Sequence, residues 1–285
     1  MLLICFCILL PIAVCAAPVG NIGDPALWNP GPFQKDGGIS IITTVSFDRQ
    51  VNDLPEQITR FPWTNPNISP PEQRHYPQTR KSKNTMDTMG LKVGAPINDS
   101  SIIYALLGTS TSTINFDYSD WTVSRSYASH DTFESGPDLY YGMGASFVMH
   151  RGEYKGDIPV TFGMDITYRR LTIEEDRFKS EGISYASTLD EVQLAFCLSA
   201  NMPTYSPYMG VKVASITGSE DYTNRNYSTL YFNEGFIHYT EDITWSKNIG
   251  YFVGVTMNIK ELFSLGLEIR AGDEKGLGIN VTSRF

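Results

Sequence analysis

The sequence predicts an all-β fold, a transmembrane antiparallel up-and-down β-barrel of about ten or twelve strands. Three observations lead to this prediction. Many segments alternate apolar with small or polar residues, the polar positions are mostly Gly, Ser, Thr and Asn, and short gaps between segments alternate with long ones. The composition agrees, because 12% aromatic residues and 24 glycines at 19% charged residues are typical of all-β proteins. A content of 41% hydrophobic residues is too low for a polytopic helical membrane protein.

The first segment of the chain has the character of a secretory signal. Met1 to Val14 is an uncharged apolar run too short to span a bilayer, and small residues follow it. Cleavage after Ala16 would leave a mature chain that starts at Ala17. A lipoprotein signal at Cys15 ranks lower, because Val14 stands where that pattern has Gly, Ala or Ser. We therefore expect a cleaved signal peptide at residues 1–16, a periplasmic N-terminal segment at 17–38 and an outer-membrane β-barrel at 39–285 of an exported bacterial protein.

The clearest alternation runs from Ile158 to Arg169, where every even-numbered residue up to 168 is apolar and the odd-numbered ones are polar, small or proline. Other clear segments are residues 191–199, 250–257, 263–270 and 277–285, and weaker ones are 39–47, 89–95, 102–118, 139–149 and 205–217. Together they give the even number of strands that a closed antiparallel barrel with both termini at one rim requires. A further hairpin within residues 218–244 would raise the count to about twelve.

In the clear segments every charged residue shares the register of the glycines. A position that faces lipid carries almost no charge, whereas a position that faces the barrel interior can be charged. We therefore expect the charged register to face inward and the apolar register to face outward. By this register the predicted pore-lining residues are Lys92, Asp165, Arg169, Glu191, Gln193, Lys212, Glu268 and Arg270.

The gaps between segments supply a separate indication, because transmembrane barrels have short turns at one rim and long loops at the other. The short gaps are residues 96–100, 150–157, 201–204 and 258–261, and the long ones are 52–84, 119–137, 171–189 and 218–244. The gap around Glu274 is short although it belongs at the long-loop rim. Aromatic residues near strand ends would suit the two membrane interfaces; these are Tyr118, Tyr141, Tyr168, Tyr205, Tyr208, Trp245 and Tyr251.

A soluble β-sandwich is the main structural alternative, because its strands also alternate. A sandwich exterior is normally rich in Lys, Glu and Asp, whereas the polar register here is mostly small and uncharged. Phe285 closes an alternating strand and resembles the C-terminal signal by which bacterial outer-membrane barrels are recognised for assembly. That resemblance implies two partners, the barrel-assembly machinery and outer-membrane lipid.

The start of the mature chain resembles a known porin family. Residues 17–21 (APVGN), 24–27 (DPAL) and 45–51 (VSFDRQV) are similar to the opening of the chlamydial major outer membrane protein (MOMP) porins. The resemblance implies a porin-like barrel. Those porins are longer and rich in cysteines that cross-link envelope proteins, whereas Cys197 alone lies well inside this mature chain. The resemblance therefore implies a smaller barrel and does not extend to disulfide cross-linking.

Motifs of catalysis are missing from the sequence. It contains no GxSxG, HExxH, CxxC or P-loop pattern, and its histidines at 75, 130, 150 and 238 are too scattered to define a metal site. We expect no enzyme activity, no cofactor and no metal. A hydrolase at the outer-membrane rim is the weakest alternative, with candidate residues Asp117, Asp120, His130, Asp131 and His238. A net charge of -9 disfavours nucleic acid as a partner.

Two functions fit the predicted barrel. The first is porin-like passive diffusion of small hydrophilic solutes or ions, favoured by a lumen rich in Gly, Ser and Thr with charges of both signs. The same charges could instead form a salt-bridged plug, because about eight strands leave an interior just filled by side chains and about ten lie near that limit.

The alternative is a non-conducting surface barrel, an adhesin or structural protein, that acts through its long loops. The gap at residues 52–84 carries six prolines and a basic stretch from Arg74 to Lys83. These cations could meet lipopolysaccharide phosphates or another acidic surface partner. The sequence leaves a homo-oligomer open.

Overall fold

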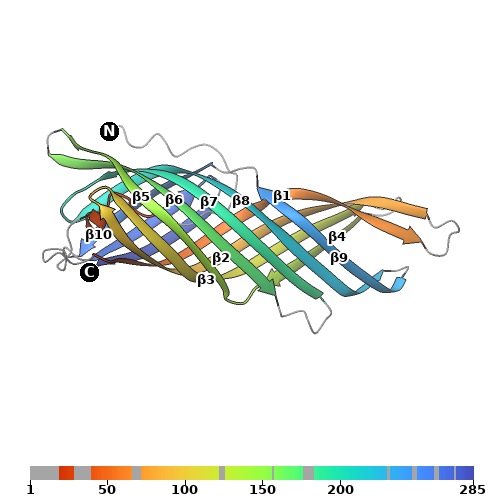
Figure 1. The fold of residues 1–285 in the computed structure, drawn as a ribbon. Helices are drawn as coiled ribbons and strands as arrows, with labels where there is room; N and C mark the ends of the chain where they lie inside the picture. Colours follow the sequence, from red (N-terminus) through yellow and green to blue (C-terminus); the bar gives the residue numbers. More distant parts are fainter. Residues whose placement is uncertain are drawn as a thin grey trace.

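In a computed structural model, the described residues are 19–28, 40–65, 72–121, 126–155, 157–175, 183–229, 232–245, 249–259, 263–272 and 274–285. They form one short helix and twelve strands (Figure 1): α1 (Pro25–Trp28), β1 (Ile42–Asn65), β2 (Glu72–Asn98), β3 (Ser101–Trp121), β4 (Ser126–Glu134), β5 (Asp138–Tyr154), β6 (Ile158–Glu175), β7 (Ile183–Ala200), β8 (Tyr205–Thr229), β9 (Phe232–Trp245), β10 (Ile249–Ile259), β11 (Phe263–Ala271) and β12 (Lys275–Arg284). Within these residues, no helix has the length and apolar character needed to cross a membrane.

Ten of these described strands close an antiparallel up-and-down barrel, which confirms the predicted fold class. The ladder runs β10-β11-β12-β1-β2-β3-β5-β6-β7-β8, and a pairing of β8 with β10 closes it. Strands β4 and β9 extend the sheet beyond this ring, where β4 pairs with the far half of β3 and β9 with the far half of β8. Residues 218–244 do contain a hairpin, formed by the end of β8 and by β9, but it adds no strand to the ring, which has ten strands and not twelve. Strand β4 was not predicted.

The two rims of the barrel differ in construction. At one rim, here called the turn rim, β1 begins, β12 ends, and β2 joins β3 across residues 99–100 while β7 joins β8 across residues 201–204. Backbone hydrogen bonds between Ile41 and Phe285 close the sheet at this rim. The opposite rim is here called the hairpin rim. The strands β10–β12 are short and end early at this rim, whereas the long strands β1–β3 and β6–β9 extend further (Figure 1).

The long loops that the sequence predicted are mostly strand, and this part of the prediction is wrong. In the expected loop at residues 52–84, β1 continues to Asn65 and β2 begins at Glu72, and these two residues are paired. The expected turn at 150–157 is likewise shortened, because β5 reaches Tyr154. Apolar alternation is required only where one face of a strand meets lipid, whereas backbone N–H and C=O groups need partners everywhere. The alternation therefore marks the lipid-facing part of a strand and underestimates its length.

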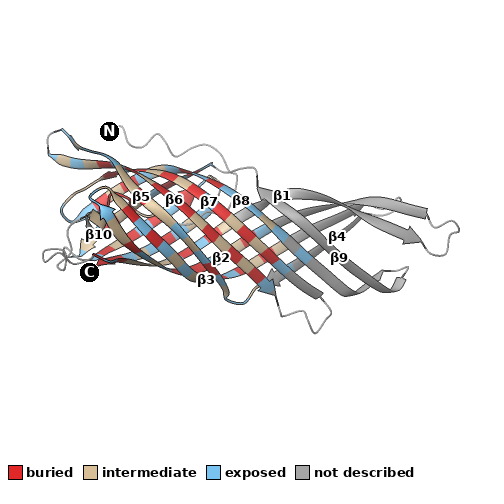
Figure 2. Ribbon diagram, viewed as in Figure 1, coloured by how far each residue is buried: buried red, intermediate tan, exposed pale blue. Residues whose placement is uncertain are grey.

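The wall of the barrel is apolar outside and polar inside, as the register predicted. Figure 2 shows buried and exposed residues alternating along the strands. Large apolar side chains stand exposed on the outside, including Met143 (64% exposed), Ile249 (60%) and Ile269 (54%). No second sheet among the described residues covers this face. The exterior is therefore that of a barrel surrounded by an apolar medium, and a β-sandwich is excluded because the sheet closes on itself.

The interface aromatics divide between the two faces. Tyr141, Tyr205 and Tyr251 are exposed on the outer face, as expected. Tyr208 is buried in the lumen, so its assignment to an outer aromatic belt is wrong. It lies on the same register of β8 as Lys212, four residues on, and that register faces inward. The side chains of Tyr118 and Trp245 lie outside the described part of the chain.

The described part of the N-terminal segment lies inside the barrel. Val19 and Ile22 are buried with Cys197, Tyr208 and Phe252, which belong to the inner faces of β7, β8 and β10. The sequence predicted a periplasmic segment at residues 17–38, and the structure places its residues 19–28 in the lumen near the turn rim. The segment lies there because the inner wall has an apolar patch around Cys197, Tyr208 and Phe252. The side chains of Val19 and Ile22 cover this patch and remove it from water.

Candidate functional site

The lumen is the candidate site, because it holds a group of buried charged residues. All eight predicted residues face inward: Asp165, Arg169, Glu191, Gln193, Lys212, Glu268 and Arg270 are buried, and Lys92 is half-buried. The charged members contact one another or other polar groups of the wall and do not line an open passage. The inward direction predicted for each of the eight residues is therefore correct. The alternation of apolar and polar residues in the sequence could not predict which of these charges form ion pairs.

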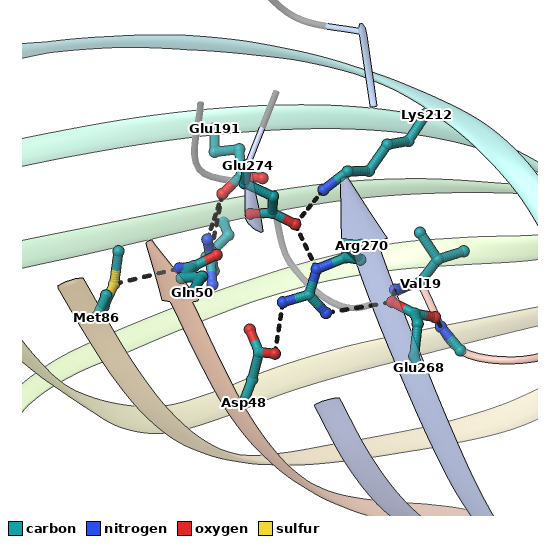
Figure 3. Close-up of polar contacts among 11 residues, drawn as sticks. Val19, Asp48, Gln50, Met86, Glu191, Lys212, Glu268, Arg270 and Glu274 are labelled. Carbon is teal, nitrogen blue, oxygen red and sulfur yellow. Dashed lines mark hydrogen bonds and ion pairs between the residues drawn. The ribbon is translucent and has the colours of Figure 1, made fainter. Parts of the chain in front are cut away.

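Five side chains form a central ion cluster: Asp48, Lys212, Glu268, Arg270 and Glu274 (Figure 3). Arg270 is its hub, since Nη2 lies 2.5 Å from Asp48 Oδ1 and Nη1 lies 3.2 Å from Glu268 Oε1. Its Nε donates to Glu274, which also accepts from Lys212 Nζ. The cluster joins β1, β8 and β11 to the residue just before β12, so it ties together one continuous arc of the ring, from β8 through β10, β11 and β12 to β1.

This cluster holds three carboxylates and two cations, each of them buried. Buried charges are tolerated only when paired, and removing one partner from such a network typically destabilises a protein by about 3–5 kcal/mol. Asp48 and Glu274 escaped the sequence prediction. Asp48 shares the inward register of Thr44 and Ser46, which could have indicated it. Glu274 follows a short turn, where the period of two no longer applies.

A second ion pair joins neighbouring strands. Arg169 of β6 stands opposite Glu191 of β7, and its Nε and Nη2 donate to Glu191 Oε2 at 2.9 and 2.6 Å. The Arg169 guanidinium also lies 5.6 Å from the centre of the Tyr140 ring. Gln193, two residues further along β7, is buried, and its amide oxygen and nitrogen make no hydrogen bond to the described residues.

A third group surrounds Asp165. Its carboxylate accepts hydrogen bonds from Tyr104 Oη (2.9 Å), Ser146 Oγ (2.6 Å) and Thr167 Oγ1 (2.7 Å). Lys92 Nζ lies 3.9 Å from the same carboxylate and 3.6 Å from the centre of the Tyr104 ring. These hydroxyl donors were not predicted as site residues, although the same inward register contains them.

The N-terminal segment fills the turn-rim half of this lumen. The backbone N–H groups of Val19 and Gly20 donate to the two carboxylate oxygens of Glu268, at 3.2 and 2.8 Å. Asp24 accepts from Ser264 Oγ at 2.5 Å, and Arg284 Nη1 donates to the Leu27 carbonyl at 2.8 Å. The segment therefore spans from the central ion cluster to the end of β12.

The space between the N-terminal segment and the barrel wall is small. A cavity of about 80 Å³ lies between the segment and the wall, and Lys92, Tyr104, Arg169 and Asn280 are among the residues that line it. A cavity of this size holds a few water molecules, because one water needs roughly 10–15 Å³ measured in this way. At this height the space between the segment and the wall therefore admits water and no larger solute.

The residues considered for a rim hydrolase lie on the extended strands. The ladder places Asp117 opposite His130, and His238 opposite Thr223; the side chains of these residues, like those of Asp120, Asp131 and His75, lie outside the described set. His150 is exposed near the turn rim. Over the described ranges, no His, Cys, Asp and Glu side chains gather in a group that could hold a metal ion. Phe285 is exposed, and its role as an assembly signal stays a prediction.

No protein-family model and no curated protein matches the chain. Among solved structures, the outer membrane protein OprG from Pseudomonas aeruginosa is similar at 10% identity and a TM-score of 0.38, covering 87% of this chain and 96% of OprG. The translocator domain of autotransporter NalP from Neisseria meningitidis is similar at 11% identity and a TM-score of 0.32, covering 88% and 92%. The attachment invasion locus protein Ail of Yersinia pestis reaches 10% identity and a TM-score of 0.21, covering 87% and 99%. The strand pairing, and not this level of similarity, establishes the barrel.

Proposed function

We propose that the chain is an integral β-barrel of a bacterial outer membrane that lets ions or small hydrophilic solutes cross through its lumen. The outer face supports the membrane location, because large apolar side chains cover it. The side of the barrel with the shortest strands also supports the membrane location. There β10, β11 and β12 have 11, 9 and 10 residues, and a tilted strand needs about 9–11 residues to cross a bilayer.

The inner register is the observation that carries the transport proposal. A lumen that only had to be filled could be filled by apolar side chains, yet Lys212, Glu268 and Arg270 lie buried inside it. Ionisable groups at membrane depth are costly, and they commonly mark the path of an ion or a polar solute. A porin-like role also agrees with the resemblance of residues 17–51 to the chlamydial porins, and it assigns no catalysis and no cofactor to the chain.

Planar bilayer recording of the purified, folded protein tests this proposal. We expect discrete conductance steps that are small and intermittent, because the described lumen is closed and a path must open within it. Absence of steps over a wide voltage range, with protein shown to be folded and inserted, would contradict the transport proposal.

A second function, a non-conducting surface barrel, is supported by the length of two strands. Strands β1 and β2 have 24 and 27 residues, more than twice what a bilayer crossing requires. Their hairpin extends from the barrel at the hairpin rim (Figure 1), where an exported partner or lipopolysaccharide would be met. Folded protein that never conducts but loses binding to lipopolysaccharide when residues 53–83 are deleted would favour this function.

A further inference from the structure

We propose that the inner wall at the turn-rim half is a binding site for the chain's own residues 19–28, and that this segment is a displaceable plug. When the segment leaves, the turn-rim half of the lumen opens to water. The effect of this opening on conductance rests on the proposed function, whereas the displacement itself can be measured without any transport.

The deep end of the segment is held by one charged residue of the wall. Glu268 accepts the backbone N–H groups of Val19 and Gly20 with its two oxygens, while Arg270 and Tyr208 bind the same carboxylate from the wall. Charge-assisted hydrogen bonds of this kind are stronger than neutral ones. Glu268 thus joins the plug to the central ion cluster.

The middle of the segment fits a shaped apolar patch. Ile22 packs against the wall at Gly163, where an added Cβ would collide with the Ile22 side chain. Gly23 faces Ser199, and a Cβ at Gly23 would collide with the Ser199 hydroxyl. Two glycines, one on the segment and one on the wall, therefore permit the close approach.

The contacts are of a kind that can be released as a unit. No described strand forms a ladder with residues 19–28, so the segment is bound through side chains of the wall and not by continuous backbone pairing. A region with few backbone ties to its neighbours opens at lower free energy than the core strands. The ten-strand ring is closed by pairing between strands, and the segment supplies none of these pairings.

Cys197 provides a reporter of the displacement. It is buried, with 1% of its surface exposed, and belongs to the apolar patch that Val19 and Ile22 cover. The backbone of Ile22 and Gly23 lies within hydrogen-bonding reach of its sulfur. A polar thiol reagent reaches Cys197 from the lumen only when the segment moves away.

The first test measures the rate at which a cationic methanethiosulfonate reagent labels Cys197 in folded protein. We expect Glu268→Gln to label at least about tenfold faster than wild type, because two charge-assisted hydrogen bonds to the plug are weakened. The matched control is Glu191→Gln, which removes a buried lumen carboxylate bound to Arg169. Its labelling rate should stay within about twofold of wild type.

Gly23→Val changes the segment alone and should also accelerate the labelling of Cys197. This variant tests the plug even if Glu268→Gln does not fold. Equal rates in all four proteins would overturn the plug.

The second test locks the segment by a disulfide between Cys197 and the variant Ile22→Cys, with Ile22→Ser as the control. Oxidation should form the bond, mapped by mass spectrometry, and should lower the open probability in planar bilayers at least about tenfold until a reductant is added. Failure to form the bond, or conductance that ignores its presence, would overturn the plug. If labelling follows the first prediction but no variant ever conducts, the plug stands and the transport proposal fails.

Discussion

The central ion cluster and the N-terminal segment share one lumen but are held there by different kinds of structure. The cluster is carried by β1, β8 and β11 and by the residue before β12, whose backbones are fixed by the ladder. The segment is held by a few contacts to Glu268, Ser264, Arg284 and the apolar patch. The wall charges are therefore structural in the closed state, whereas the segment is the part of the lumen that can move at little cost to the barrel.

The largest effect is expected at the hub of the ion cluster. Arg270→Ala leaves Lys212 as the one cation of the cluster beside three buried carboxylates, and it should lower the free energy of unfolding by about 3–5 kcal/mol or prevent folding. Urea unfolding in lipid vesicles measures this loss. Arg49→Ala is the matched control, because Arg49 stands exposed on the outside in an ion pair with Asp87 and should cost about 0–1 kcal/mol. Similar losses for the two variants would contradict the fixed role of the cluster.

A charge on the outer face should cost slightly less. Leu267 is exposed at the middle of β11, one residue from the buried Glu268. Leu267→Arg should destabilise the vesicle-embedded protein by about 2–4 kcal/mol, while Asn98→Arg at the turn rim should cost about 0–1 kcal/mol. Vesicle unfolding again provides the measurement. A neutral Leu267→Arg would show that this face does not meet lipid.

Truncation of the segment should have a small effect on global stability. Ile22→Ala removes buried apolar contacts that would cost about 2–5 kcal/mol in a core that could not open. Because the segment can undock first, the loss in vesicle unfolding should be capped at the free energy of undocking, about 2 kcal/mol. A loss as large as that of Arg270→Ala would mean that the segment is part of the core and not a plug.

The smallest effect concerns ion preference. Arg169 and Arg170 are neighbours on β6 that point to opposite faces, Arg169 into the lumen and Arg170 outward toward Asp190. Arg169→Gln should shift the cation-to-anion permeability ratio of open channels toward cations by about twofold, and Arg170→Gln should leave it unchanged. Reversal potentials in a salt gradient measure both. Unchanged values for Arg169→Gln would remove this residue from the conduction path.

The register could be predicted from the sequence because lipid acts on every second residue. Asp165, Glu268 and Arg270 were assigned to the lumen because a charge on the other face would meet the acyl chains. Their partners could not be predicted. Arg270 and Asp48 are 222 residues apart, and their contact depends on how β11 and β1 are staggered on either side of β12.

Two further features could not be predicted from the apolar–polar period of the strands. Glu274 enters the lumen from a turn, where the backbone no longer alternates between faces. Residues 19–28 have no strand pattern, and their place became clear only once the wall around Cys197 was known. The length of β1 and β2 was missed for a related reason, because both faces of a strand beyond the bilayer meet water and the apolar period disappears.

A spin-label scan along β10 measures whether the outer face of the barrel meets lipid. Single cysteines at positions 251–257, introduced with Cys197→Ser and reconstituted into vesicles, report whether each site meets lipid or the interior. We predict that lipid-soluble oxygen relaxes labels at Tyr251, Val253 and Met257 strongly, and that labels at Phe252 and Thr256 stay protected, in step with the exposed and buried residues of this strand. Uniform relaxation along the strand, or access of a water-soluble nickel complex to Val253, would contradict an outer face turned toward acyl chains.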